Sequence, residues 1–173
     1  MGDNDWPEDI HFANGLWVCA NDYGQIYTSA DLAIWTLRYD APLPWILTSI
    51  DYQNGRWVVV GGANGEGDTK GFEGGNIVTS TDGINWIDQV PVEKSAFVGE
   101  VAYRLSPIAY GGGQWIGATS GYGGFFRSVD GLNWSHNSAF LIDALPKVQN
   151  EAEYQIGIWI VPLQDGTILM STL

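Results

Sequence analysis

The sequence predicts an all-β protein in which four small antiparallel sheets form a closed ring. Three observations lead to this prediction: short phrases recur along the chain, 23 of the 173 residues are glycine, and helical periodicity is nearly absent. Many glycines without a collagen period indicate many tight turns, and therefore many short strands. A chain of this length suits a single domain with a substantial core.

The first recurring phrase predicts a hairpin. It consists of an aromatic residue, a glycine three positions later and a tryptophan two positions after that. The glycine lies where a hairpin turn needs a positive φ, and apolar residues follow as in a strand. The four copies are FANGLWVCA (12–20), YQNGRWVVV (52–60), YGGGQWIGA (110–118) and YQIGIWIVP (154–162).

The second phrase predicts the next strand of each repeat. A glycine and a serine stand five residues apart, and an apolar residue follows the glycine by two positions. The four copies are GQIYTS (24–29), GNIVTS (75–80), GGFFRS (123–128) and GTILMS (166–171). We therefore expect four units of three or four strands, at about 8–38, 48–88, 106–136 and 152–173.

The third phrase has an aspartate two residues after a serine and a tryptophan six residues after it. Its three copies are SADLAIW (29–35), STDGINW (80–86) and SVDGLNW (128–134). The phrase resembles the Asp-box, S-x-D-x-G-x-T-W, of the BNR-type β-propellers, a family that includes sialidases and many non-enzymatic binding proteins. Two copies have the glycine one place earlier and Asn in place of Thr, and the first copy has Leu32 in place of the glycine.

The resemblance implies that each box joins the third and fourth strands of a propeller blade, on the outer edge and away from the axial ligand face. Elementary chemistry agrees, because an aspartate can accept hydrogen bonds from the backbone N–H groups that follow it, while a tryptophan packs over the turn. We therefore predict a structural role for all members of the boxes. These are Ser29, Asp31, Trp35, Ser80, Asp82, Gly83, Trp86, Ser128, Asp130, Gly131 and Trp134.

The two ends of the chain are expected to complete one sheet together. A unit of this size cannot bury both faces of its sheet alone, so units must stack, either in a ring or along a line. Only Thr172 and Leu173 follow the last serine, so the fourth unit has no box of its own. Because Trp6 follows an acidic residue by three positions, we expect residues 1–7 to supply the missing strand and close the ring.

Charge and composition argue against several classes of partner. The formal charge of −13 opposes binding to nucleic acid and to anionic membranes, both of which attract basic proteins. No apolar run is long enough to span a bilayer, and the first residues lack a signal-peptide pattern. Cys19 is the only cysteine, which excludes an internal disulfide, and its apolar neighbours predict a buried thiol.

We do not expect an enzyme. The sialidases of the resembling family clamp a carboxylate with three arginines, whereas this chain has only four in total: Arg38, Arg56, Arg104 and Arg127. It also has four units where the sialidase propeller has six. Another glycosidase would need two facing carboxylates, and an acid pair with raised pKa values in one cleft would revive that hypothesis. The sequence shows no nucleophile elbow, no zinc-ligand set and no phosphate-binding loop.

Candidate ligand contacts lie outside the repeated positions. Glu66, Asp68 and Glu73 belong to an insertion at 61–76 and could bind Ca²⁺, although their spacing fits no EF-hand and a solvated loop is the alternative. No other cofactor is expected. Three aromatic residues could contact a sugar or a protein: Trp45, Tyr122 and Phe125. For Phe125, packing in the core is an equally open alternative.

We expect a non-catalytic binding or structural module. Repeats of this form resemble those of phage and prophage virion proteins and of some bacterial surface proteins. The resemblance implies a tail, receptor-binding or capsid-decoration protein, made in the host cytoplasm, that contacts other virion proteins or symmetry copies of itself. The inserts expected to make these contacts are 39–49, 61–76, 90–107 and 136–153.

Two other functions remain open. One is a carbohydrate-binding, lectin-like propeller that recognises a cell-surface glycan. The other, more remote, is a glycoside hydrolase. Outside a virion, the protein would be cytoplasmic or attached to an extracellular surface.

Overall fold

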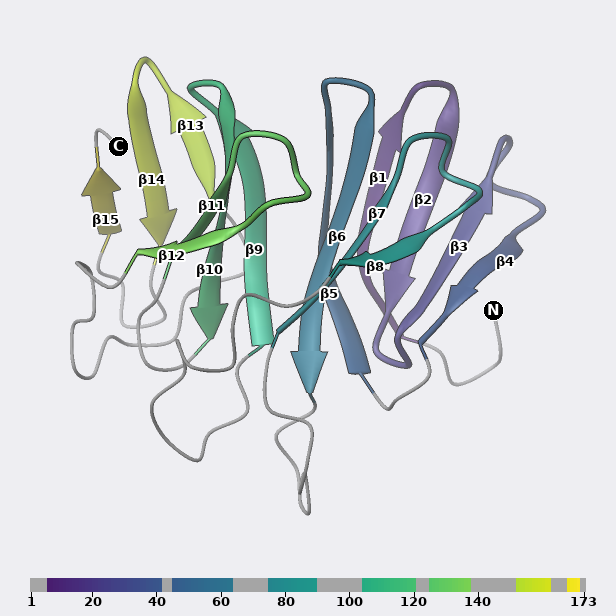
Figure 1. Cartoon of the computed structure of the whole chain (residues 1–173). Coiled ribbons are helices and arrows are strands. Elements are labelled where there is room, and N and C mark those ends of the chain that lie inside the picture. Colours follow the sequence, from purple (N-terminus) through teal and green to yellow (C-terminus); the bar gives the residue numbers. More distant parts are fainter. Residues whose placement is uncertain are drawn as a thin grey trace.

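Four antiparallel sheets lie side by side in chain order in the computed structural model (Figure 1). The structure describes residues 6–41, 45–63, 75–89, 104–120, 125–137, 152–162 and 168–171. All regular elements in these ranges are strands, and none of the described residues belongs to a helix that could cross a bilayer. The prediction of an all-β, propeller-like fold is confirmed.

Every strand pairs with its neighbour in the chain, so each sheet is a simple meander. The first sheet contains β1 (Pro7–Ala13), β2 (Leu16–Asn21), β3 (Gln25–Ser29) and β4 (Thr36–Asp40). The second contains β5 (Trp45–Gln53), β6 (Arg56–Ala63), β7 (Gly75–Ser80) and β8 (Ile87–Gln89). The third contains β9 (Arg104–Gly111), β10 (Gln114–Ser120), β11 (Phe125–Ser128) and β12 (Ser135–Asn137). The fourth contains β13 (Glu153–Gln155), β14 (Ile158–Pro162) and β15 (Ile168–Ser171).

The first phrase forms the hairpin that opens each sheet, as predicted. Both central residues of the turn have positive φ in every copy, for example Asn14 (51°) with Gly15 (75°) and Ile156 (46°) with Gly157 (81°). Two positive φ angles define the type I′ turn, whose twist matches that of the flanking strands. The repeated glycine therefore fixes the register of these hairpins.

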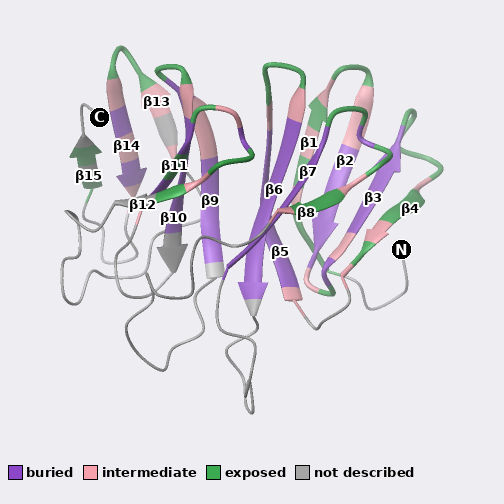
Figure 2. Cartoon of the chain, in the orientation of Figure 1, coloured by how far each residue is buried: buried purple, intermediate pink, exposed green. Residues whose placement is uncertain are grey.

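The second strand of the second sheet, β6, packs against both neighbouring sheets, because its side chains alternate between the two faces. In β6, Trp57 and Val59 belong to a core cluster with Val18 of the first sheet. Val58 and Val60 join a second cluster, which includes Trp115 of the third sheet. Buried residues accordingly fill the middle of the row (Figure 2).

The first strands of successive sheets are in contact along one side: β1 with β5, β5 with β9, and β9 with β13. Hydrogen bonds tie these inner strands together. The Thr48 hydroxyl donates to the Leu105 carbonyl at 2.6 Å, and the Ile108 N–H donates to Ser49 Oγ at 3.2 Å. This side corresponds to the axis of a propeller.

Trp6 differs from the expectation that it acts as the box tryptophan of the fourth sheet. Its N–H donates to the Asp22 carboxylate at 3.1 Å and its carbonyl accepts the Asp22 N–H at 3.2 Å. The side chain is 72% exposed. The reason is chain length: Trp35 stands ten residues before β5, with an outer strand between, whereas Trp6 directly precedes β1. Residues 1–5 lie outside the described residues, so closure of the ring stays a prediction.

Candidate functional site

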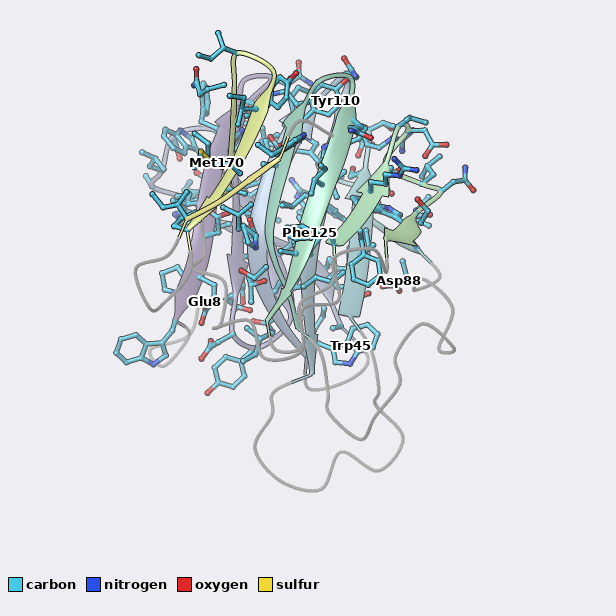
Figure 3. All side chains as sticks on the ribbon, turned by 90° about the vertical axis from the view of Figure 1, so that its left-hand side faces the viewer. Glu8, Trp45, Asp88, Tyr110, Phe125 and Met170 are labelled. Carbon is cyan, nitrogen blue, oxygen red and sulfur yellow. The ribbon has the colours of Figure 1, made fainter. Side chains whose placement is uncertain are left out.

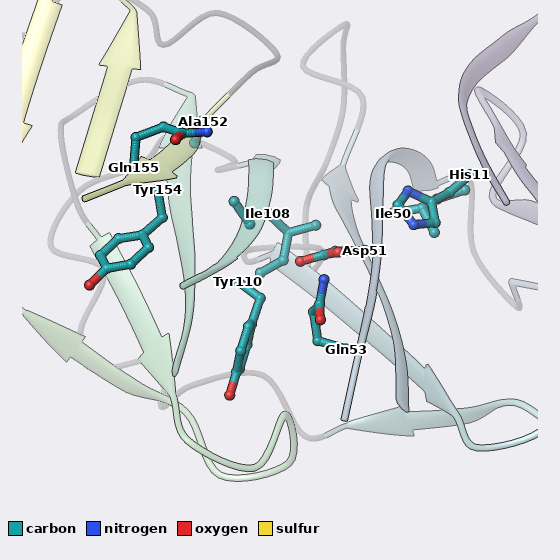
Figure 4. Close-up of a pocket in the computed structure, with 10 residues that line it drawn as sticks. His11, Ile50, Asp51, Gln53, Ile108, Tyr110, Ala152, Tyr154 and Gln155 are labelled. Atoms are coloured by element: carbon teal, nitrogen blue, oxygen red, sulfur yellow. The ribbon is translucent and has the colours of Figure 1, made fainter. Parts of the chain in front are cut away.

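The candidate site is a pocket of about 280 Å³ on the side where the inner strands meet. All four sheets contribute to it, through residues at the aromatic position of the first phrase or within two positions of it (Figure 4). Its lining residues are His11, Ile50, Asp51, Gln53, Ile108, Ala109, Tyr110, Ala152, Tyr154 and Gln155. A concave site with a few polar groups among apolar ones is where small ligands bind in most folds.

Asp51 is the buried charge of this pocket, with 9% of its surface exposed. Its carboxylate accepts the Tyr52 N–H at 2.7 Å. Burial raises the pKa of Asp51 above its ordinary value, and the backbone N–H groups of Tyr52 and Tyr110 and the nearby His11 oppose that rise only in part. The folded protein therefore favours the protonated form of Asp51 more than the unfolded chain does.

Asp9 lies beside this pocket and joins the first two sheets. One oxygen accepts the Ile10 N–H and the other accepts the Ile50 N–H of β5, both at 2.7 Å. Burial raises the pKa of Asp9 as well, with these N–H groups and His11 acting in the opposite direction. Since Asp51 similarly accepts an N–H of the third sheet, the two carboxylates clamp successive inner strands.

Asp9 and Asp51 are thus an acid pair with raised pKa values, the observation that would favour a glycosidase. Their geometry is that of structural groups, because each carboxylate accepts backbone N–H groups from its own strand and from the next. Sequence reasoning did not single out either residue. The available signal was an acid within the short apolar strands DIHF and SIDY.

The pH dependence of stability tests this account of Asp51. Because the pKa of Asp51 is higher in the folded than in the unfolded protein, the contribution of Asp51 to stability falls as the pH rises from about 3.8 through the folded pKa. Asp51→Asn has no carboxylate to ionise. The free energy of unfolding of this variant minus that of the wild type is therefore expected to increase between pH 3.5 and 7. Urea denaturation across this range measures the difference. Asp40→Asn, on exposed β4, is the control. A difference in unfolding free energy between Asp51→Asn and the wild type that does not change with pH would contradict the account.

The three predicted boxes form tight turns between the third and fourth strands of their sheets, called here the serine–aspartate turns (29–35, 80–86 and 128–134). In the second, Asp82 accepts the N–H groups of Ile84 and Asn85, both at 2.8 Å. The Trp86 indole donates to the Gly83 carbonyl at 3.1 Å. The backbone N–H and side-chain amide of Asn85 and the backbone N–H of Ile84 hold the pKa of Asp82 well below its usual range.

The other two serine–aspartate turns repeat this geometry. Asp130 accepts two backbone N–H groups at 2.8 Å, and the Trp134 indole donates to Gly131 at 3.1 Å. In the second and third turns the side-chain amide of Asn85 or Asn133 also donates to the aspartate, at 2.7 Å. The first turn has no asparagine at this position, so Asp31 accepts backbone N–H groups and the Ser29 hydroxyl. The carboxylates of these turns are therefore occupied by their own backbone.

The other predicted contact residues are scattered. Trp45 begins β5 and is partly buried (Figure 3). Phe125 begins β11 and packs against the core cluster of Ala118 and Val161, in line with the core alternative. The remaining candidates lie outside the described residues: Glu66, Asp68, Glu73 and Tyr122. Among the residues that are described, no group of three or more His, Cys, Asp or Glu side chains could hold a metal ion.

The three arginines whose side chains the structure describes do not form a carboxylate clamp at the pocket. Arg38 lies on β4, where its Nε donates to Thr28 Oγ1 at 3.0 Å. Arg56 and Arg127 belong to other sheets, and none of the three lines the pocket. Cys19 is buried and free, and burial raises the pKa of its thiol to about 11.

Comparison with known proteins identifies the fold. No protein-family model and no curated protein matches the sequence. Similar solved structures are β-propeller proteins. The computationally designed Ika4 protein is 13% identical with a TM-score of 0.61, covering 98% of this chain and 92% of that chain. YCF48 from Cyanidioschyzon merolae is 16% identical with a TM-score of 0.64, covering 99% of this chain and 54% of that chain.

A GH32 beta-fructofuranosidase from Bombyx mori, BmSUC1 in complex with sucrose, is 16% identical with a TM-score of 0.52. This alignment covers 90% of the chain and 40% of the fructofuranosidase. The chain therefore spans about half the length of YCF48 and less of the fructofuranosidase. At these identities the similarity establishes the propeller fold, and one fold carries many functions.

Proposed function

We propose that the chain is a non-catalytic propeller module whose function is to bind other proteins. The observation that carries the proposal is the exposure of large apolar side chains at the serine–aspartate turns. Ile34, Ile84 and Leu132 belong to three different turns and are 73%, 45% and 38% exposed. Apolar side chains repeated along the outer edge of successive sheets offer the kind of surface that a protein partner covers.

The arrangement of the acids supports a role without catalysis. A general acid–base pair needs carboxyl oxygens that reach the substrate. Asp9 and Asp51 instead hold neighbouring strands together through backbone N–H groups. The proposed binding function uses no cofactor.

Within this proposal, the chain is a component of a phage virion: a tail, receptor-binding or capsid-decoration protein. Support comes from the resemblance of its repeats to those of virion proteins. Its partners are then other virion proteins or copies of itself. The formal charge of −13 favours such contacts over contacts with packaged nucleic acid.

Quantitative mass spectrometry of purified particles tests the virion assignment. Particles from a culture that carries the gene are expected to contain the chain in a fixed ratio to the major capsid protein. Ile84→Glu combined with Leu132→Glu is expected to lower that ratio about tenfold, because charges replace apolar contact surface. Asp40→Asn should leave the ratio unchanged, and particles without the chain would contradict the assignment.

A second candidate function, glycan binding, is favoured by the axial pocket. The rings of Tyr110 and Tyr154 line it together with the amides of Gln53 and Gln155, a combination that suits the apolar faces and hydroxyl groups of a sugar. A glycan array distinguishes the two functions. Binding that is lost in Gln53→Ala, an exposed lining residue, would favour the lectin-like function.

A further inference from the structure

Each pair of neighbouring sheets is joined in the same way. The tryptophan of the first phrase faces the preceding sheet, and its ring makes a tilted or edge-on contact with the aromatic residue five positions before it. Trp57, Trp115 and Trp159 are 0%, 1% and 2% exposed. Trp17 has the same partner geometry, with its ring 4.7 Å from that of Phe12, yet it is only partly buried because no sheet precedes the first.

The first sheet therefore ends the row with an apolar face that no described strand covers. Val18 and Ala20 pack toward the second sheet, so Trp17 and its strand partner Phe12 lie on the opposite face. Ile10 lies two residues before Phe12 and on the same side of β1. Ile10 and Phe12 are 47% and 52% exposed.

The fourth sheet ends the row with a second apolar face, which is likewise uncovered by any strand in the described ranges. Val161 packs with Ala118 of the third sheet, so alternate residues of β14 lie on the outer side. Ile160 pairs there with Met170, and Pro162 pairs with Ile168. Met170 and Ile168 are 71% and 57% exposed, and Figure 3 looks onto this end of the row.

We propose that two copies of the chain join head to tail, with the fourth sheet of each copy covering the first sheet of the other. The two end faces are the separate halves of the joint that recurs between the sheets of one chain, so a second copy supplies the missing half at both ends. Two such joints related by a twofold axis close a ring of eight sheets, in place of the predicted closure of one chain on itself. The chain also superposes over 99% of its length on 54% of the larger protein YCF48.

One departure from the repeat makes the proposed joint differ locally from the joints within the chain. Inside the chain, the first residue of each second strand packs on the turn glycine of the next sheet: Leu16 on Gly83 and Arg56 on Gly131. The corresponding residues at the proposed joint are Ile158 and Leu32. Leu32 has φ +65° and is 48% exposed, an unfavourable conformation for a leucine. A Cβ at the internal turn glycines would lie only 2.6–2.8 Å from the packing side chain. Ile158 of a second copy must therefore pack beside Leu32 and not directly over its backbone.

Association in solution tests the proposal. The wild type is expected to show twice the chain mass of 18.9 kDa by light scattering after gel filtration at micromolar concentration. Phe12→Lys and Met170→Glu are each expected to weaken the dimer about 100-fold or more, since each puts a charge into both joints. Ile87→Lys is the matched control, because Ile87 is 65% exposed on β8 and away from both end faces.

Mixing the two charge variants makes the test specific for a head-to-tail joint. A mixed dimer of one Phe12→Lys copy and one Met170→Glu copy has one wild-type joint and one joint in which lysine faces glutamate. An equimolar mixture is therefore expected to form dimers that neither variant forms alone. Circular dichroism and thermal melting verify that both variants fold. A wild-type monomer at 100 µM, dimers that persist in both variants, or a mixture that stays monomeric would each overturn the proposal.

The proposed dimer names a second copy of the chain as one partner for the proposed protein-binding function. It rests on that function only in treating the chain as a protein-binding module. A monomeric chain would overturn the head-to-tail ring and leave the particle experiment unaffected. A dimer absent from particles would support the ring and contradict the virion assignment.

Discussion

Replacing Trp57 by alanine is expected to lower the free energy of unfolding by about 3–5 kcal/mol, the range found for large aromatic residues in a core. The side chain is fully buried between the first and second sheets. Its ring lies 4.7 Å from Tyr52 and meets His11 edge-on at 5.8 Å. Both neighbouring sheets are fixed by their strand pairing, so they cannot close the resulting cavity. Urea denaturation gives the loss.

The matched control is Trp17→Ala, which removes the same residue from the same repeat position. Because Trp17 is only partly covered, the expected loss in a dilute, monomeric sample is about half that of Trp57→Ala or less. Among the described residues, the Trp57 indole N–H has no hydrogen-bond partner, so Trp57→Ala breaks no side-chain hydrogen bond. Equal losses for the two variants would contradict the importance of the preceding sheet.

The local structure of each repeat could be predicted because it depends on residues close in sequence. The glycine of the first phrase permits the positive φ of a type I′ turn, so Gly15 and Gly157 mark hairpins without any tertiary information. The serine–aspartate turns are equally local, since Asp82 accepts hydrogen bonds from residues two and three positions ahead. A repeated phrase then extends each prediction to the next sheet.

The axial site could not be predicted, because it depends on which strands lie side by side. Asp9 bonds to Ile50, 41 residues away, and nothing near Asp9 in the sequence indicates that partner. The same limit applies to Trp6. Its acidic neighbour suggested a box, but the pairing with Asp22 depends on where β1 enters the first sheet. Composition and motif spacing carry no information about such contacts.

Tryptophan burial in this protein depends on a neighbour as much as on sequence. Trp17 and Trp57 occupy the same position of the same phrase, yet the second is fully buried and the first is not. A repeat of this kind has a stable core only where another repeat precedes it. The first and fourth sheets are therefore where an added partner gains the most buried apolar surface.

Gly61→Ala is expected to reduce the free energy of unfolding by about 3 kcal/mol or more, beyond the usual range for overpacking. A Cβ at this position would overlap the carbonyl oxygen of Ile46 and lie 2.8 Å from the Cα of Leu47. Both obstacles are backbone atoms of β5, which cannot rotate away as a side chain can. The register shift between Leu47 and Ser49 brings this carbonyl close to Gly61. Thermal and urea denaturation measure the loss.

Movement of β5 away from the new methyl group is opposed by its contacts with the third sheet. Thr48, within the register shift, donates its hydroxyl hydrogen bond to Leu105 at 2.6 Å, so displacing the strand would break a buried contact between sheets. Gly117→Ala is the matched control in β10, where the nearest atom to an added Cβ is Ile108 Cδ1 at 3.6 Å, an ordinary contact. That variant is expected to stay within about 0.5–1 kcal/mol of the wild type, with a gain from reduced chain entropy. If the two variants lost similar amounts of unfolding free energy, the loss would come from replacing a strand glycine as such and not from the backbone contact at Gly61.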